Sequence, residues 1–371
     1  MGNWKNGELG DFVTLKRGFD LPQQKREDGQ VPIFSSSGIT GTHSTAMVKA
    51  PGVITGRYGT IGEVFYAAKD FWPLNTTLFV EDFHGNDAKF IYYFLKTLEW
   101  SKFTSASAVP GINRNTVHKE IVSLPDIETQ RRIASTLSMF DEKIKINTEI
   151  NDNLEQQAQS YFQELFVDNA DPEWAIGTIS DLGTVVGGST PSKAKPEYYT
   201  ESGIAWITPK DLSINKSKFV SHGENDITEL GLRNSSAAIM PEGTVLFSSR
   251  APIGYIAIAA GEVTTNQGFK SVVPKPEIGT PFVYFFLKNT LPVIEGMASG
   301  STFKEVSGST MKNVPAVIPD AETLAKFSDF CAPIFAQQRT LEEQNQSLAK
   351  LRDSLLPKLM SGEIDVSAVQ L

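Results

Sequence analysis

Basic residues of this sequence lie in short stretches rich in serine, threonine, asparagine and glycine. Arginine, lysine, amide and hydroxyl side chains suit hydrogen bonds to phosphate oxygens and base edges. In the first half of the chain, the candidates for such contacts are Lys25, Arg26, Ser35, Ser36, Arg57, Tyr58, Asn113 and Arg114. In the second half they are Lys193, Lys210, Arg250, Ser301 and Lys304. These residue types predict polar loops that contact a nucleic acid.

Two arginines stand out because each comes shortly before an Ile-Gly pair. Arg57 precedes Ile61-Gly62, and Arg250 precedes Ile253-Gly254. A repeated arginine of this kind either contacts DNA or forms a structural salt bridge, and the sequence leaves both alternatives open.

Groups that could perform catalysis are few and scattered. Cys331 is the one cysteine and there are four histidines, so neither a disulfide within the chain nor a cysteine-based zinc site is predicted. The stretch 183–190 is rich in glycine but lacks the lysine of a phosphate-binding loop, and it predicts a strand that ends in a glycine turn. No dinucleotide-binding glycine motif and no Gly-x-Ser-x-Gly motif occurs. We therefore predict no catalytic residues, no metal and no cofactor on this chain.

The elements that must position the loops occur twice. Trp4, Gly7, Asp11, Thr14 and Gly18 recur as Trp174, Gly177, Asp181, Thr184 and Gly188. Further along, Asn75 recurs as Asn266, the segment 90–96 as 282–288, and Pro125-Asp126 as Pro319-Asp320. The offset grows from 170 residues (4 to 174) to 194 residues (125 to 319), so the second copy carries extra loop residues. Two copies of one domain are predicted.

Each copy has the same order of predicted elements. Strand-like segments bounded by glycine come first, such as 52–55 and 243–247. A short helix carries the repeated aromatic segment, which we expect to lie in the core. A long helix then begins after Asp126 in the first copy and after Asp320 in the second, both suitable N-caps.

The two long helices share one heptad pattern. Seam positions spaced alternately by four and three residues run from Ile133 to Leu165 and, shifted by 194, from Phe327 to Leu359. A period of 3.5 residues predicts a coiled coil. The seam residues chosen as packing contacts are Leu137, Ile144, Asn151, Leu154, Ile334, Leu341, Asn345 and Leu348.

We expect the two helices to pack antiparallel on each other, because a pseudo-two-fold axis would relate the copies. The alternative is that each helix packs on its own domain. Pro333 is expected to kink the second helix or delay its start, and Pro357 and Gly362 are expected to end it.

Composition sets the class of protein. The 371 residues are 40% hydrophobic and 21% charged, which is typical of a globular protein, and no run of apolar residues is long enough to span a membrane. No secretory signal is recognisable, so a cytoplasmic location is expected. The net charge of −9 lies mostly on the segments 126–168 (net −5) and 320–371 (net −3), whereas 1–125 (+1) and 169–319 (−2) are nearly neutral. A nucleic-acid surface would therefore lie on the two long segments.

The sequence resembles the specificity subunits of type I restriction–modification systems. The resemblance rests on the tryptophan-led entries 4–18 and 174–188, the strand segments 32–41 and 204–208, the helix 125–165 and the closing stretch 355–364. It implies an α+β fold with two tandem, mainly β target recognition domains (1–125 and 169–319). They are separated by two long antiparallel spacer helices, 126–168 and 320–371.

The resemblance also implies a non-catalytic function. Such subunits read a bipartite double-stranded DNA sequence, one half per recognition domain, and dock two methyltransferase subunits on their spacer helices. Restriction–translocase subunits join the complex, and S-adenosylmethionine, ATP and magnesium belong to those partners. One departure is that the stretch 109–113 is typical of the family, whereas the second copy has Ser307-Gly308-Ser309-Thr310 nearby.

Two alternatives stay open at this point. The same domains could serve a type II-like system with a fused methyltransferase–nuclease. A protein of another class, a bivalent protein-binding scaffold, would fit the acidic net charge.

Overall fold

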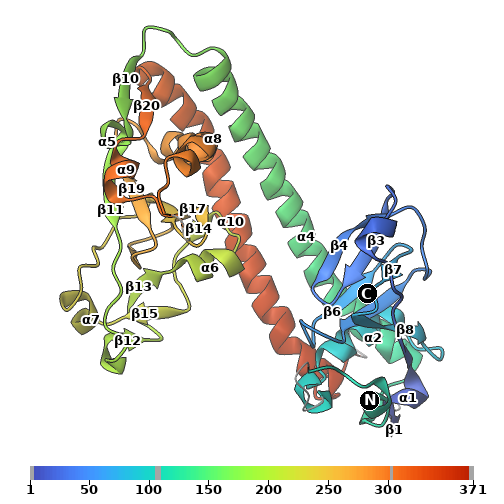
Figure 1. Cartoon of the computed structure of the whole chain (residues 1–371). Helices are drawn as coiled ribbons and strands as arrows, with labels where there is room; N and C mark the ends of the chain where they lie inside the picture. The colour runs from blue at the N-terminus through green and yellow to red at the C-terminus, as the bar shows by residue number, and fades with distance from the viewer. Residues whose placement is uncertain (1–3, 105–109, 301–303, 367–371) are drawn as a thin grey trace. The chain divides into compact units, whose positions relative to one another are not determined.

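The structure, a computed structural model, describes residues 4–104, 110–300 and 304–366 (Figure 1). The chain forms two compact units, Met1–Ile144 with Gln346–Leu371, and Lys145–Asn345. Each unit holds one copy of the repeat and part of both long helices, α4 (Ile127–Gln163) and α10 (Ala321–Met360). The fold is α+β, with two domains and two spacer helices.

The first copy is built from short strands and helices around one four-stranded antiparallel sheet, β2–β8–β5–β6. A second sheet has the order β4–β3–β7, and β1 pairs with β9. The elements are β1 (Lys5–Glu8), α1 (Leu9–Phe12), β2 (Thr14–Arg17), β3 (Val31–Ser35), β4 (Gly38–His43), β5 (Gly52–Gly56), β6 (Val64–Ala67), β7 (Trp72–Pro73), β8 (Thr77–Asp82), α2 (Ala88–Lys96), α3 (Arg114–His118) and β9 (Ile121–Leu124).

The second copy has a five-stranded sheet, β11–β19–β16–β17–β14, and a four-stranded sheet, β12–β15–β13–β18. Its elements are β10 (Ala175–Thr178), α5 (Ile179–Leu182), β11 (Gly183–Gly187), β12 (Tyr199–Thr200), β13 (Ile204–Ile207), α6 (Pro209–Ile214), β14 (Phe219–Val220), β15 (Asn225–Ile227), α7 (Glu229–Arg233), β16 (Val245–Ser249), β17 (Ile253–Ala259), β18 (Thr264–Thr265), β19 (Lys270–Pro274), α8 (Thr280–Gly296), α9 (Gly308–Lys312) and β20 (Pro315–Ile318).

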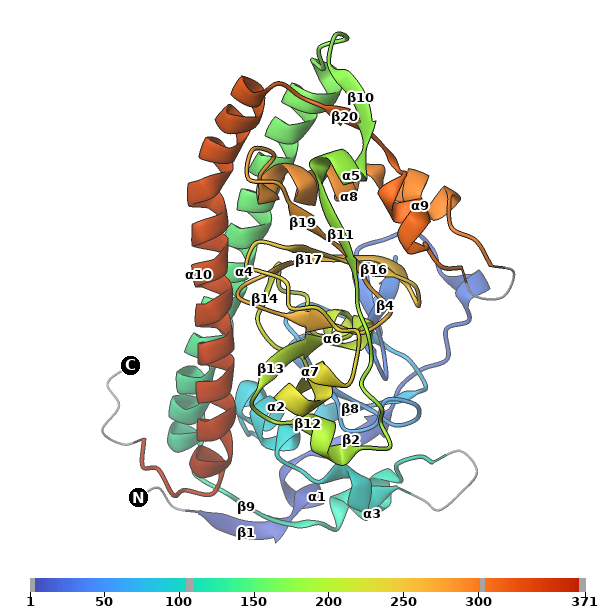
Figure 2. The same cartoon turned by 90° about the vertical axis from the view of Figure 1, so that its left-hand side faces the viewer.

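The strand order confirms the duplication. The order β2–β8–β5–β6 of the first copy corresponds to β11–β19–β16–β17 of the second. The parallel pair β3·β7 corresponds to β13·β18. The antiparallel pair β1·β9 corresponds to β10·β20, and all four strands are labelled in Figure 2. The extra residues of the second copy include α6, α7 and the edge strand β14, which all lie between β13 and β16 in the chain.

The repeated aromatic segments form the cores, as predicted. Phe90, Tyr93 and Phe94 of α2 are buried in the first copy, and Phe282, Phe285 and Phe286 of α8 are buried in the second. Each core also takes in apolar residues from both long helices. Among the described residues, no helix has the length and hydropathy needed to cross a bilayer.

The long helices begin where the sequence predicts. The Asp126 carboxylate accepts the N–H of Thr129 (2.9 Å), and the Asp320 carboxylate accepts that of Thr323 (2.9 Å). Every seam position from 133 to 165 and from 327 to 359 is buried or half-buried. The helices are therefore packed both on each other and on the domain cores, so the two alternatives for their packing are both realised.

The two helices run antiparallel. Within the second unit, Asn147 contacts Asn345 (2.9 Å) and Asn151 contacts Gln338. The ring of Tyr161 lies tilted against those of Phe327 and Phe330, with centroids 6.0 and 4.5 Å away. The residue numbers of the partners on α10 thus decrease as those on α4 increase. Within the first unit, Asp141 of α4 pairs with Arg352 of α10.

Pro333 does not delay the start of the second long helix, and Pro357 does not end it. The helix α10 starts at Ala321 and passes through Pro333 and Pro357. Both prolines are exposed, as are residues 329 and 353, four positions earlier. The carbonyl groups that lose a helical partner at a proline therefore lie on the solvent side of the helix, where water can bind them. Gly362 with φ +75° follows the helix end, as expected for a left-handed terminating residue.

Candidate nucleic-acid interface

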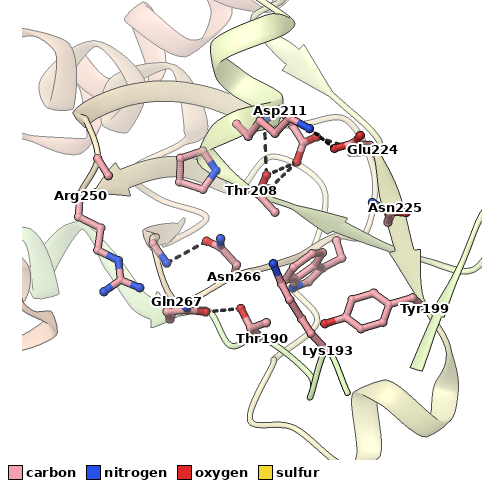
Figure 3. A pocket seen from close by; sticks show the side chains of 15 residues that line it. Thr190, Lys193, Tyr199, Thr208, Asp211, Glu224, Asn225, Arg250, Asn266 and Gln267 are labelled. Atoms are coloured by element: carbon pink, nitrogen blue, oxygen red, sulfur yellow. Dashed lines mark hydrogen bonds and ion pairs between the residues drawn. The ribbon is translucent and has the colours of Figure 1, made fainter. Parts of the chain in front are cut away.

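The second copy contains a cavity of about 700 Å³, here called the second cavity (Figure 3). Seven short segments meet around it: the turn after β11, β12, β13, the start of α6, the start of β15, the end of β16, and the β18–β19 turn. Its lining residues are Thr190, Lys193, Tyr199, Trp206, Thr208, Pro209, Lys210, Asp211, Glu224, Asn225, Arg250, Ala251, Asn266, Gln267 and Gly268. The strand order brings these distant segments together.

Two aromatic residues give the second cavity a fixed wall. The rings of Tyr199 and Trp206 lie edge to face with centroids 5.7 Å apart. The Tyr199 hydroxyl donates to the carbonyl of Pro191 (2.6 Å), and the Trp206 indole N–H donates to the carbonyl of Ser189 (3.0 Å). Both polar tips are thus bonded to backbone, which fixes the rings.

The carboxylates of the second cavity are already bonded. Asp211 accepts from the N–H and hydroxyl of Thr208 (2.7 and 2.6 Å) and from the N–H of Glu224 (2.8 Å). Glu224 pairs with Lys210 (2.5 Å), and this hydrogen bond raises the pKa of Lys210. The cavity therefore exposes less negative charge than its composition suggests.

The repeated arginines differ in their partners. Arg250 forms an ion pair with Glu305 (3.4 Å), which also lies 3.8 Å from Lys270. Arg57 forms no ion pair among the described residues, and its guanidinium lies over the ring of Tyr58, 4.5 Å from the centroid. The salt-bridge alternative thus holds for Arg250, whereas the structure leaves Arg57 available for a ligand.

The first copy contains a cavity of about 480 Å³, here called the first cavity. Its lining residues are Arg17, Arg57, Tyr58, Leu78, Gly111, Ile112, Asn113, Arg114 and Asn115. The segment 111–112 is held against the Arg57–Tyr58 turn, because the N–H of Ile112 donates to the carbonyl of Arg57 (3.0 Å). Gly111 is required there, since a Cβ at this position would collide with the Tyr58 ring.

Seven of the sequence-predicted contact residues line these cavities. They are Arg57, Tyr58, Asn113 and Arg114 in the first, and Lys193, Lys210 and Arg250 in the second. Ser36 is not among the residues that line the two cavities, and its hydroxyl lies near Gly59, the residue after Tyr58. Lys304 is exposed next to Glu305, the partner of Arg250.

Other predicted residues lie elsewhere. Arg26 donates to the carbonyl of Thr40 (3.1 Å) and Ser35 to the carbonyl of Gly38 (3.1 Å), so both stabilise the β3–β4 region. Lys25 is exposed in a turn before β3, and Ser301 lies outside the described residues.

Sequence reasoning missed several lining residues. These are Arg17 of the first cavity, and Tyr199, Asn225, Asn266 and Gln267 of the second. A signal existed for Asn266, which is the repeat partner of Asn75. None existed for Tyr199 and Asn225, because they reach the cavity through strand pairing between distant segments.

A buried ionic cluster attaches the second copy to both helices. The Lys218 ammonium, 6% exposed, contacts Glu155 of α4 (2.7 Å) and the side-chain oxygen of Gln338 of α10 (2.8 Å). Glu155 also pairs with Lys288 (2.5 Å). Burial acts to raise the pKa of Glu155, but the charges of Lys218 and Lys288 outweigh it and lower that pKa to about 2. Burial lowers the pKa of Lys218 to about 8, against the attraction of Glu155.

The spacer residues chosen from the heptad lie along the helix contacts. Leu137, Ile334 and Leu341 are buried, and Ile144, Leu154 and Leu348 are half-buried. Asn345 pairs with Asn147 rather than Asn151, while Asn151 contacts the backbone of Gln338. The amide nitrogens of Asn147 and Asn151 thus donate across the helix contact, whereas the buried side-chain oxygens of both residues have no hydrogen-bond partner among the described residues.

The model of the type I restriction modification DNA specificity domain matches residues 1–156 and 172–350. The chain belongs to this family. Each matched segment covers one copy of the repeat, including its cavity and part of one long helix. The duplication seen in the strands is therefore a duplication of the family's specificity domain.

Individual relatives agree with this assignment. The MjaIX specificity subunit of the type I restriction enzyme of Methanocaldococcus jannaschii is 37% identical over 195 residues, which are 52% of this chain and 45% of that protein. This chain thus aligns with less than half the length of that relative. The putative type I specificity subunit S.MpnORF638P of Mycoplasma pneumoniae is 32% identical over 380 residues. The alignment covers 96% of this chain and 96% of that protein.

A solved structure supports the fold. The crystal structure of the type I restriction-modification system S subunit from M. genitalium matches with a TM-score of 0.63 and covers 96% of both chains. Its sequence identity is 19%, so the likeness concerns the specificity-subunit fold alone.

Proposed function

We propose that this chain is the DNA sequence-specificity subunit of a type I restriction–modification complex. Its recognition domains are residues 1–125 and 169–319, and its spacers are 126–168 and 320–371. Each recognition domain reads one half of a bipartite double-stranded site. The proposal is carried by one observation: two copies with the same strand order each present a cavity lined by basic and amide side chains, with Arg57 and Arg250 at corresponding places.

The residues of both cavities suit this role. Arginine and lysine contact phosphates and guanine, and asparagine and glutamine contact base edges. The near-neutral charge of both domains calls for a partner that adds positive charge, because phosphate contacts supply much of the affinity for DNA.

The chemistry belongs to partner subunits in this proposal. Two methyltransferase subunits dock on the spacer helices, and restriction–translocase subunits complete the complex. S-adenosylmethionine, ATP and magnesium bind to those partners, which act with this chain on DNA in the cytoplasm. Support comes from the acidic spacer segments and from exposed apolar residues on the long helices, namely Met139, Ile146 and Ile150 of α4 and Leu351 of α10.

Domain exchange tests the proposal. Residues 170–319 are replaced by the corresponding segment of a relative with a different target, and the methylated sequence of host DNA is determined by long-read sequencing. We expect one half of the motif to change and the other to stay. An unchanged motif from an active complex would contradict the proposal. If DNA footprinting of the complex shows no protection at a split site, a protein-binding scaffold is favoured.

The spacer helices set the gap between the half-sites in the same proposal. Removing one heptad from each helix removes about 10 Å of helix, or roughly three base-pair steps. The expected motif has the same half-sites with a shorter gap. If methylation persists with the original gap, the helices do not set it.

A further inference from the structure

Asn266 has a fixed orientation in the second cavity. Its side-chain oxygen accepts the backbone N–H of Gly268 (2.8 Å). A backbone N–H only donates, so the oxygen must face Gly268, and the amide nitrogen must face away from it. Figure 3 shows Asn266 between Arg250 on one side and Lys193 on the other. The amide nitrogen has no hydrogen-bond acceptor among the described residues.

Among the neighbouring side chains, the groups that have no hydrogen-bond partner in the described structure are mostly donors. The side-chain oxygen of Gln267 accepts from the hydroxyl of Thr190, which leaves the Gln267 amide nitrogen available. Lys193 forms no ion pair within the described part of the chain. The carboxylates of Asp211 and Glu224 are bonded, as described above, and the remaining amide, Asn225, is exposed on β15.

The two amide nitrogens on the consecutive residues Asn266 and Gln267 match the acceptors of one base in particular. In the major groove, guanine presents two acceptors, O6 and N7, whereas thymine presents one. Asparagine reads adenine by turning both its oxygen and its nitrogen to the base, and in Asn266 the oxygen is held by Gly268. A cavity of about 700 Å³ also gives room for a base edge.

We propose that Asn266 is a specificity-determining residue that donates to the acceptor edge of a guanine in the second half-site. The proposal rests on the proposed function and adds a base and a residue to it. Gln267 supplies the second donor, and Lys193, which forms no ion pair among the described residues, lies at the same cavity for a neighbouring phosphate.

In the first copy, an asparagine on another loop has its side-chain oxygen bound to a backbone N–H in the same way. Asn75, the repeat partner of Asn266, donates its amide nitrogen to Asp20 and is not available. Asn113 instead has its oxygen bound to the N–H of Asn115 (3.0 Å) and lies in the first cavity beside Arg57 and Arg114. Asn113 therefore takes the corresponding role for the first half-site.

The test uses Asn266→Asp in the complex with its methyltransferase. The substitution keeps an oxygen for the Gly268 N–H and replaces the free donor by an acceptor, so the turn is retained. Asn215→Asp is the matched control, because Asn215 binds the N–H of Ser217 (3.0 Å) in the same way outside both cavities. Binding is measured with duplexes carrying each base at every position of the motif, and methylation motifs are read from host DNA.

We expect Asn266→Asp to lower the preference for guanine at one position of the second half-site by about tenfold or more, with the first half-site unchanged. Asn113→Asp should do the same in the first half-site only, and Asn215→Asp should change neither. A uniform loss of binding at all sequences, or an unaltered preference, overturns the assignment of Asn266. If domain exchange moves the half-site while Asn266→Asp does not alter it, the inference fails and the proposed function stands.

Discussion

The two copies share a frame and differ in what they present on it. Corresponding strands have the same order, and corresponding aromatic helices fill both cores. The first cavity is dominated by arginines, with Arg57 free of an ion pair among the described residues. The second is dominated by amides and lysines, and its arginine is paired with Glu305. The shared core therefore fixes the position of the cavity in each copy, whereas the loops determine which chemical groups line it.

The copies also differ in how they are attached to α4. In the first, Asp141 binds Arg352 and the hydroxyl of Tyr93. In the second, Glu155 binds Lys218 and Lys288, and Lys218 is almost fully buried. Removing one partner of a buried ion pair leaves an uncompensated charge, which costs more than at a half-exposed site.

The largest expected effect comes from removing the charge of Glu155, the carboxylate at the buried attachment of the second copy. Glu155→Gln should lower the free energy of unfolding by about 3–5 kcal/mol, because two lysines lose their counter-ion. Asp141→Asn should cost less, since Arg352 keeps Asp353 as a partner. Urea unfolding of both variants measures the two values. Equal losses would show that the second cluster is not the stronger attachment.

Acid should weaken the second attachment selectively. The pKa of Glu155 lies at about 2 in the folded chain, below its ordinary value of 4.5, so the stabilisation is complete above pH 4.5 and is lost as pH falls towards 2. A shift of this size corresponds to about 3 kcal/mol. The difference in unfolding free energy between the natural chain and Glu155→Gln should therefore shrink over this range. A difference that stays constant from pH 5 to pH 3 would contradict the ionic cause.

These two clusters also mark the limit of prediction from sequence. The repeat and the heptad predict two domains and two antiparallel helices, because periodicity in a sequence survives as periodicity in structure. No local pattern in the sequence predicts the cluster of Lys218, Glu155 and Lys288, because these residues meet only after three segments fold together. Asn266 was visible as a repeated residue, but its fixed amide depends on the turn to Gly268. Pro333 does not delay the start of α10, because the effect of a proline depends on the side of the helix that it faces.

A glycine substitution sharpens the comparison of the cavities. Gly111→Ala should displace the Tyr58 ring and lower stability by about 1–3 kcal/mol, as other overpacked sites do. It should weaken contacts to the first half-site and leave the second unaffected. Gly261→Ala in the second copy is the control, because its Cβ would meet nothing within 4 Å. Binding to duplexes altered in one half-site separates the effects, and equal behaviour of the two variants would argue against a close approach at Gly111.

The smallest expected effects come from the repeated arginines. Arg57→Ala should weaken DNA binding by the complex and reduce its salt dependence by about one unit of slope if the guanidinium contacts a phosphate. Arg250→Ala should change the slope less, because Glu305 already neutralises this arginine. Titrations at several salt concentrations give both slopes. A larger change for Arg250→Ala would reverse the assignment of free and paired arginines.

One measurement tests most directly whether two equivalent domains each read half of a site. The second domain, residues 169–319, is replaced by a second copy of the first, residues 1–125, with both spacer helices kept. Because the helices run antiparallel within each unit, the methylated motif should become an inverted repeat of the first half-site. A motif that keeps the original second half-site, in an active complex, would contradict the division of recognition between the two domains.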